Sequence, residues 1–267
     1  MPEIKLIGID LDGTLVVNAE VSPRNVEAIR AATSRGVTVA IATGRPHVSA
    51  ETFVDQLELH GVPIISFNGA QVRRPRETEA LYTAPIAPEI AAEVVQYCID
   101  RRLHMHYYLD DTMYVTRLSH WALLYLGRTG MSAVPAGDMR RFSGRAPIKI
   151  IVCVPPQDAP EVLAEGQRHF GDRLVVTHSM PEYIEFLSPD AGKGKALLWL
   201  AEHLAIAPEQ TMGMGDMLND LELVQMAGVG VAMAHAQEPV KRAADYVAAS
   251  SAEGVAEAIE KYILGQA

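Results

Sequence analysis

The stretch KLIGIDLDGTL, residues 5–15, joins an apolar run to two aspartates, Asp10 and Asp12, followed at once by Gly13 and Thr14. A continuous apolar run over residues 4–9 is typical of a strand buried on both faces, as in a parallel sheet covered by helices. Open α/β sheets bind ligands beyond the carboxyl ends of their strands. The stretch therefore predicts a parallel sheet with two carboxylates at its ligand-binding edge.

Strands and helices alternate on both sides of this stretch. Ser22-Pro23 predicts the start of a helix that Gly36 ends. A strand is expected at 37–42, a helix at 46–60 and a strand at 62–67. Near the C-terminus, the pattern predicts helices at 193–204 and 218–227 and strands at 210–214, 229–233 and 244–248. Alternation of this kind predicts an α/β fold with a doubly wound, parallel, Rossmann-like sheet.

The middle of the chain follows a different pattern. A helix is expected at 88–101, and strands at 103–109 and 113–117 flank the turn residues Asp110-Asp111-Thr112. Further strands are expected at 147–154, 173–178 and 182–187. His104 and His106 alternate with other residues and so share one face, which we interpret as half-exposed. We therefore predict a discontinuous core, residues 1–84 and 188–267, with an inserted α+β domain at 85–187.

Composition narrows the class of protein. The chain has 267 residues, a formal net charge of −10 and no lysine-rich or arginine-rich tract, so we expect no nucleic-acid partner. No stretch is long and apolar enough for a membrane span, so we expect no membrane association. The two cysteines, Cys98 and Cys153, are far apart in apolar contexts and are expected to be buried thiols. A reducing, cytoplasmic location fits these features.

Polar residues follow each predicted core strand. Thr43-Gly44-Arg45 and Asn68-Gly69 end the second and third strands, and Gly215-Asp216 ends a later one, with Asn219 and Asp220 close behind. Carboxylates gathered in one place repel each other unless a cation keeps them ionised. Oxygen ligands of this kind suit Mg²⁺, which also binds substrate phosphate.

The same edge offers groups that suit a phosphoryl group. Thr43 supplies a hydroxyl, Gly13 and Gly44 permit a close approach of the backbone, and Lys193 supplies a positive charge just before a predicted helix. These are the parts that phosphoryl transfer requires: a nucleophile, charge neutralisation and a proton donor for the leaving group.

Four motifs occur in a fixed order: Asp10-Leu11-Asp12-Gly13-Thr14, Thr43-Gly44-Arg45, Lys193-Gly194 and Gly215-Asp216-Met217-Leu218-Asn219-Asp220. Together with the large insert before Lys193, they resemble the haloacid dehalogenase-like (HAD) superfamily. The insert and the segment from AGVGVAMAHA onward resemble its Cof-type, type IIB phosphatases in particular. The resemblance covers essentially the whole chain.

The resemblance implies a role for each motif residue. Asp10 would be the nucleophile that forms an aspartyl-phosphate, and Asp12 would be the general acid and base. Asp10, the backbone carbonyl of Asp12 and Asp216 would bind Mg²⁺, with Asp220 in support. Thr43, Gly44, Lys193 and Asn219 would bind the phosphoryl group, and the inserted domain would act as a cap that gives substrate specificity.

We therefore expect a Mg²⁺-dependent phosphatase acting on a small phosphorylated metabolite, with a sugar phosphate as the first choice. A phosphomutase of the same superfamily and a non-catalytic phosphometabolite-binding protein are the alternatives. Lys195 is a rival of Lys193 for the phosphate, Mn²⁺ a rival of Mg²⁺, and both a monomer and a homodimer are open. His235 stands where many relatives have Asn and is expected to stay out of the chemistry.

Overall fold

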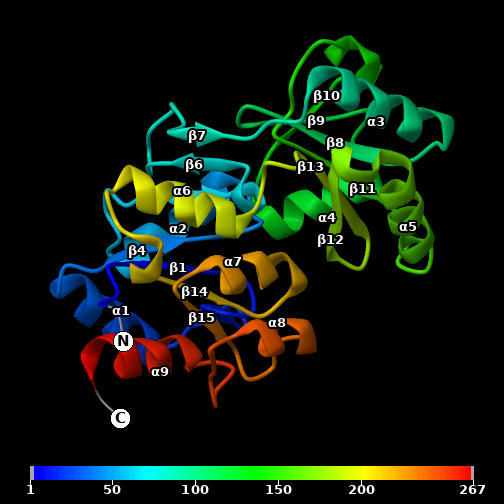
Figure 1. Cartoon of the computed structure of the whole chain (residues 1–267). Coiled ribbons are helices and arrows are strands. Elements are labelled where there is room, and N and C mark those ends of the chain that lie inside the picture. Colours follow the sequence, from blue (N-terminus) through cyan, green and yellow to red (C-terminus); the bar gives the residue numbers. More distant parts are fainter. Residues whose placement is uncertain (1–2, 266–267) are drawn as a thin grey trace. The chain divides into compact units, whose positions relative to one another are not determined.

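A computed structural model describes residues 3–265 of the chain, which divides into two compact units. The core unit comprises residues 1–82 and 192–267, and the inserted unit comprises residues 83–191 (Figure 1). Two segments far apart in the sequence therefore form one unit around an insert.

The centre of the core unit is a five-stranded parallel sheet in the order β16-β15-β14-β1-β4. Its strands are β1 (Leu6–Ile9), β4 (Thr38–Ile41), β14 (Thr211–Gly215), β15 (Val229–Ala232) and β16 (Tyr246–Val247). Every residue of β1, β14 and β15 is buried. This burial explains why these strands are almost purely apolar, and the doubly wound fold predicted from the sequence is confirmed.

Helices cover both faces of this sheet (Figure 1). Successive side chains of a strand point to opposite faces, so an apolar strand needs a packing partner on each face. On one face, Ile7 and Ile9 pack in a cluster with residues of α1 (Pro23–Ser34), α2 (His47–Leu57) and α9 (Gly254–Ile259). On the other, Leu6 packs in a cluster with residues of α6 (Lys193–His203) and α7 (Leu221–Met226). A shorter helix, α8 (Glu238–Ala243), follows β15. Ser22 caps α1 as predicted, with its hydroxyl accepting a hydrogen bond from the Arg24 N–H at 3.2 Å.

Three details differ from the predicted elements. The third strand, β5 (Ile64–Ser66), meets the parallel sheet only at a bridge between Ala42 and Ile65 and instead begins an antiparallel sheet with β6 (Gln71–Arg73) and β7 (Tyr82–Thr83). The chain reverses direction at residues 67–69, which have positive φ angles of 51°, 55° and 87°. The helix expected at 218–227 begins as a 3₁₀ turn, Leu218–Asp220, before α7. A short hairpin, β2 (Val16–Val17) and β3 (Glu20–Val21), was not predicted.

The inserted unit is built on a six-stranded sheet in the order β10-β9-β8-β11-β13-β12. Its strands are β8 (His104–Leu109), β9 (Thr112–Val115), β10 (Ala133–Pro135), β11 (Lys149–Cys153), β12 (Val175–Met180) and β13 (Tyr183–Leu187). Tyr107, Ile150 and Phe186 are on one face and pack with residues of α3 (Pro88–Asp100) and α5 (Ala159–Phe170). This packing gives the unit a hydrophobic core of its own.

The opposite face of that sheet is polar and aromatic. His106 lies on it, fully buried against Tyr125 of α4 (His120–Thr129), with ring centroids 4.9 Å apart. His104 shares the face and is half-buried. The interpretation of both histidines as half-exposed is therefore wrong for His106, because α4 covers it.

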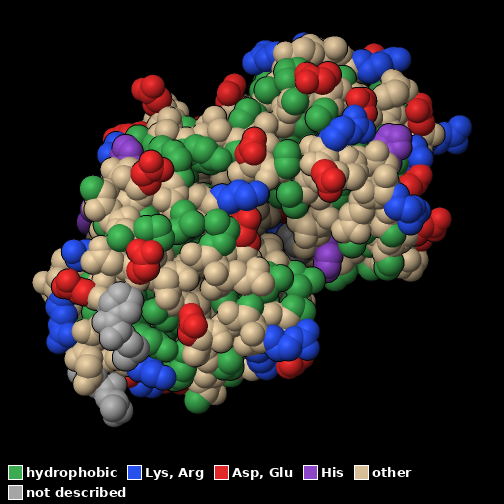
Figure 2. Space-filling model, viewed as in Figure 1, with side chains coloured by type: hydrophobic (Ala, Val, Ile, Leu, Met, Phe, Trp, Pro, Cys, Tyr) green, Lys and Arg blue, Asp and Glu red, His purple; other side chains and the backbone are tan. Residues whose placement is uncertain are grey.

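The surface carries charges of both signs. Figure 2 shows Lys and Arg side chains interspersed with Asp and Glu on one face. Pairs such as Arg173–Glu93, 2.9 Å apart and each 46% exposed, stabilise the fold by at most about 1 kcal/mol. Cys98 and Cys153 are buried free thiols, as predicted. Between residues 3 and 265, none of the helices has the length and apolar composition that crossing a membrane requires.

Candidate active site

The candidate site lies at the carboxyl ends of β1, β4 and β14 in the core unit. Asp10 directly follows β1, Asp216 directly follows β14, and Thr43 comes two residues after β4. These three strands are neighbours in the parallel sheet, so their ends meet at one edge. The sheet order thus gathers motifs that are up to about two hundred residues apart in the sequence.

Three buried carboxylates gather at this edge. Asp10, Asp216 and Asp220 each offer an oxygen, and these oxygens all lie within 4.8 Å of one another. Burial, followed by the negative charge of Asp220, raises the pKa of Asp10 well above its usual range, although Lys193 opposes the effect. Burial and the charge of Asp220 also raise the pKa of Asp216. The cluster therefore favours any cation that reaches it.

Lys193 is the positive charge inside this cluster. Its ammonium donates to Asp10 Oδ1 and to Asp220 Oδ1, both at 2.5 Å, and its side chain is fully buried. Burial disfavours the charged form, but the two carboxylates outweigh burial and raise the pKa of Lys193. Lys193 is therefore a charged group held next to the candidate nucleophile.

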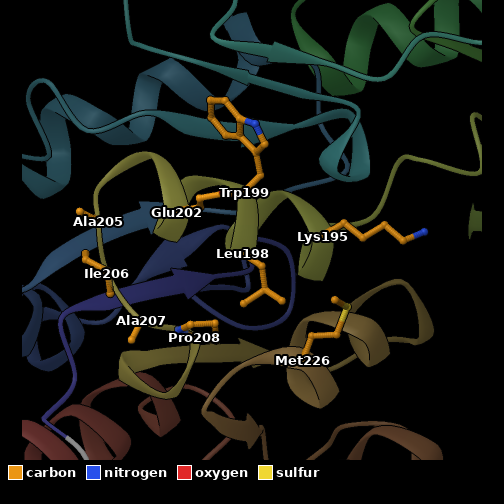
Figure 3. Close-up of a pocket in the computed structure, with 9 residues that line it drawn as sticks. All are labelled: Lys195, Leu198, Trp199, Glu202, Ala205, Ile206, Ala207, Pro208 and Met226. Carbon is orange, nitrogen blue, oxygen red and sulfur yellow. The ribbon is translucent and has the colours of Figure 1, made fainter.

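Lys195, the rival lysine, points elsewhere. Its side chain is 44% exposed, and its ammonium lies 3.6 Å from Glu222 Oε1. Residues two apart on a helix do not share a face. Lys195 instead lines an apolar groove of about 700 Å³ beside α6, together with Leu198, Trp199, Glu202, Ala205, Ile206, Ala207, Pro208 and Met226 (Figure 3). None of the candidate site residues lines this groove.

Asp220 shapes the loop that presents Asp216. Its second oxygen, Oδ2, accepts hydrogen bonds from the backbone N–H groups of Asp216 (3.0 Å) and Met217 (3.1 Å). The 3₁₀ turn Leu218–Asp220 starts two residues after Asp216, at the residue where the sequence predicts a helix to begin. Asp220 folds back onto the preceding loop, where two backbone donors need an acceptor.

Thr14 and His235 also contact Asp216. The Thr14 hydroxyl donates to Asp216 Oδ1 at 2.9 Å, and His235 Nε2 lies 3.3 Å from Asp216 Oδ2. The hydrogen bond from Thr14 and the proximity of His235 both counteract the rise in the pKa of Asp216. His235 thus contacts a candidate metal ligand, and its absence from the chemistry stays a prediction. The sequence does not predict this contact, because it forms only where the chain returns to Asp216 after β15.

Asp12 has an environment unlike that of Asp10. Its side chain is 56% exposed, and Arg45 donates to both of its oxygens, from Nε at 2.8 Å and from Nη2 at 2.5 Å. One aspartate of the motif is thus buried beside a lysine, while the other is accessible and paired with an arginine. Different environments of this kind allow two carboxylates to take different catalytic roles.

Three of the predicted phosphate-binding residues, Thr43, Gly44 and Asn219, lie next to Asn68. The Asn219 amide donates to Asn68 Oδ1 at 3.1 Å, and a Cβ atom on Gly44 would lie only 2.9 Å from that oxygen. Thr43 is fully buried, and its hydroxyl accepts from the Arg45 N–H at 3.1 Å. Asn68 was the residue that sequence reasoning undervalued. The Asn-Gly dipeptide after a strand was its only signal, and turns commonly carry the same dipeptide.

A divalent cation fits the donor set of this edge. Asp10, Asp216 and Asp220 supply carboxylate oxygens, the donors that hard cations such as Mg²⁺ prefer. Burial and then the negative charge of Asp220 raise the pKa values of Asp10 and Asp216, and a bound cation would favour the ionised form of both carboxylates. The residues therefore match a metal that carries positive charge into the site.

Comparison with known proteins agrees with this geometry. Residues 7–259 match the family of haloacid dehalogenase-like hydrolases. The Bacillus subtilis 5-amino-6-(5-phospho-D-ribitylamino)uracil phosphatase YcsE is 31% identical, with 98% of this chain and 97% of the relative covered.

Solved structures agree as well. A haloacid dehalogenase-like hydrolase from Bacteroides thetaiotaomicron superposes with a TM-score of 0.85 at 28% identity, covering 97% of this chain and 99% of that chain. The HAD subclass IIB sugar phosphatase BT4131 superposes with a TM-score of 0.83 at 25% identity, covering 97% and 98%. This chain therefore belongs to the haloacid dehalogenase-like hydrolases, as a phosphatase of the Cof-type, subclass IIB group.

Proposed function

We propose that the protein hydrolyses a sugar phosphate in a Mg²⁺-dependent reaction in which the phosphoryl group passes through Asp10. The observation that carries this proposal is the buried contact of Asp10 with Lys193, within a cluster that also holds Asp216 and Asp220. A carboxylate next to a fixed ammonium can attack phosphorus while that ammonium offsets the charge of the phosphoryl oxygens.

Asp10, Asp216 and the backbone carbonyl of Asp12 would hold the Mg²⁺ ion, with Asp220 supporting the loop. When bound, the ion would neutralise charge on the phosphoryl oxygens. Lys193, Thr43 and Asn219, with the backbone at Gly44, would orient the phosphoryl group for in-line attack. The hardness of the three carboxylates favours Mg²⁺ over softer ions.

The reaction takes place in two balanced steps. A carboxylate oxygen of Asp10 attacks phosphorus, the bond from phosphorus to the alcohol oxygen breaks, and Asp12 gives its proton to that oxygen. Asp12 then accepts a proton from water as the water oxygen attacks phosphorus. The bond from phosphorus to the Asp10 oxygen breaks, which releases inorganic phosphate and restores the Asp10 carboxylate. In the structure Arg45 holds Asp12 in a two-point ion pair. Because Arg45 occupies both oxygens of Asp12, we propose that Arg45 releases Asp12 before it acts as an acid.

Two relatives support the choice of substrate class. The name of BT4131 says that it is a sugar phosphatase, and the name of YcsE gives a substrate with a phosphorylated ribityl chain. Both names describe a phosphate ester on a polyhydroxylated carbon chain. We therefore propose a phosphorylated sugar or sugar alcohol as the substrate of this protein.

The test measures release of inorganic phosphate from a panel of sugar phosphates, sugar alcohol phosphates and nucleotides, with Mg²⁺ and with a chelator. Asp10→Asn should abolish release, whereas Asp55→Asn should leave it unchanged, because Asp55 is 59% exposed on α2 and pairs with Arg76. Asp12→Asn should also lower release strongly, because Asp12 donates a proton in the first step and accepts one in the second.

Three outcomes would contradict parts of the proposal. Release that survives Asp10→Asn would refute the covalent route. Release that is indifferent to the chelator would refute the role of the metal. Phosphate moved to a second hydroxyl of the sugar, with no free phosphate, would identify a phosphomutase instead.

A further inference from the structure

The inserted unit contains a cavity of about 320 Å³ that is lined by none of the residues assigned to the proposed reaction. It lies where β8 begins at His104 and β11 ends at Cys153, two residues that are partners in the antiparallel register. This end of the sheet is opposite the end at which β13 finishes and the chain leaves the unit. The volume lies at the lower end of the range of about 300–1,000 Å³ that is common for small-molecule sites.

Two arginines make the lining of this cavity positive. Arg102 and Arg117 both line it, and neither has an ion-pair partner among residues 3–265. Some other arginines of the same unit do form ion pairs, as Arg140 does with Asp138 and Arg173 with Glu93. Unpaired positive charge around a cavity is notable in a chain with a net charge of −10. It favours an anionic occupant.

The titratable groups on the wall leave this positive charge largely in place. Burial and then the positive charge of Arg117 lower the pKa of His104 to about 4, so His104 is neutral near pH 7. Because the charge of Arg117 contributes to this lowering of the His104 pKa, the guanidinium lies close enough to affect a side chain of the cavity wall. Asp158 adds one negative charge, which leaves the lining with a net positive charge.

The remaining wall is mostly apolar and aromatic. Leu103, Val154, Pro155 and Val162 line the cavity together with Trp121. The Ser119 hydroxyl, also on the wall, lies 3.2 Å from His104 Nδ1. A ligand that suits these surfaces carries an anionic group for the arginines and an apolar ring or chain for the rest.

A metal or nucleophile site is a poorer interpretation of the same residues. His104, His106 and Cys153 lie together, but in the part of the chain that the structure describes only the Asp10 cluster brings three ligand atoms within reach of one ion. Burial raises the pKa of the Cys153 thiol, so it is not a ready thiolate ligand or nucleophile. The cavity offers recognition, not covalent chemistry.

We propose that this cavity binds a small organic anion, held by Arg102 and Arg117 through its charge and by Trp121 and the aliphatic wall through its apolar part. The residues that line the cavity belong to the inserted unit, and the proposed catalytic residues belong to the core unit.

Benzoate is the probe, and benzamide is its uncharged isostere. Trp121 is one of only two tryptophans in the chain, so its fluorescence reports on the cavity in the full-length protein. Titration with benzoate should change this fluorescence saturably, and Trp121→Phe should abolish the change. Benzamide should bind at least about tenfold more weakly, which corresponds to the loss of one charge-assisted hydrogen bond.

Arg102→Gln combined with Arg117→Gln should also weaken benzoate binding at least about tenfold. Arg168→Gln is the matched control, since it removes one exposed positive charge of the same unit outside the cavity and should leave binding unchanged. Circular dichroism checks that each variant is folded. Equal binding of benzoate and benzamide, benzoate binding that survives the double substitution, or no saturable signal with the wild type would each overturn the proposal.

Discussion

Lys193→Met is expected to destabilise the protein strongly when no divalent cation is present. Methionine keeps most of the length of the lysine stem but leaves Asp10 and Asp220 without the ammonium that contacts both at 2.5 Å. A unit-charge attraction at that separation amounts to about 7 kcal/mol per contact at an effective dielectric constant of about 20. Part of this attraction only offsets the cost of burying the ammonium, and removing one partner of a buried ion pair typically costs about 3–5 kcal/mol.

The free energy of unfolding in urea at pH 8, with EDTA, measures this loss. Lys195→Met is the matched control on the same helix, because a 44% exposed ammonium 3.6 Å from Glu222 contributes less than about 1 kcal/mol. Mg²⁺ should restore part of the stability of Lys193→Met, since the metal binds only the folded cluster. Phosphate release should fall at least about 100-fold in Lys193→Met, as for the loss of one charge-stabilising donor.

Free energies of unfolding for Lys193→Met and Lys195→Met that agree within about 1 kcal/mol in EDTA would contradict this prediction, because substitutions away from a buried pair commonly differ by that much. Equal phosphate release by the two variants would show in addition that Lys193 does not contact the phosphoryl group.

Three further predictions concern Gly13, the affinity for Mg²⁺ and His106 of the inserted unit. Gly13→Ala should abolish activity, because its Cβ would lie 2.5 Å from Asp216 Oδ2, whereas Gly36→Ala, which shares a positive φ but meets nothing within 4 Å, should lose only about 1–2 kcal/mol of stability and keep full activity. Calorimetry should show Mg²⁺ affinity falling and proton release rising as the pH decreases, because protons compete for Asp10 and Asp216, whose pKa values are raised; a pH-independent affinity would contradict this. Burial lowers the pKa of His106 from 6.5 to about 3, so its contribution to stability is complete above pH 6.5 and is lost as the pH falls toward 3. By pH 4 the loss should reach about 3 kcal/mol. His106→Gln should flatten this dependence in urea unfolding, and the exposed His120→Gln should not.

The order of strands and helices in the core was readable from the sequence because buried parallel strands are uniformly apolar. Strands at 4–9, 37–42 and 210–214 were predicted close to the observed β1, β4 and β14. Motif residues after these strands were predictable as neighbours, since the carboxyl ends of parallel strands share one edge. Family membership followed from the same four motifs.

Contacts between side chains distant in sequence were decided only by the tertiary structure. Periodicity cannot tell Lys193 from Lys195, because both begin the same helix; the packing of α6 on the sheet directs one ammonium to Asp10 and the other toward Glu222. The contact of His235 with Asp216 likewise depends on where the chain returns after β15.

The inserted unit shows the same division. Alternation in residues 104–109 predicted a strand and placed His104 and His106 on one face, but it could not say that α4 covers His106 and leaves His104 at a cavity. Local pattern therefore determined which segments form strands and helices, because that depends on neighbouring residues. The burial of a side chain, its pKa and the partner of its charge depend on the residues that pack against it. Only the tertiary structure decided these properties, because those residues are distant in the sequence.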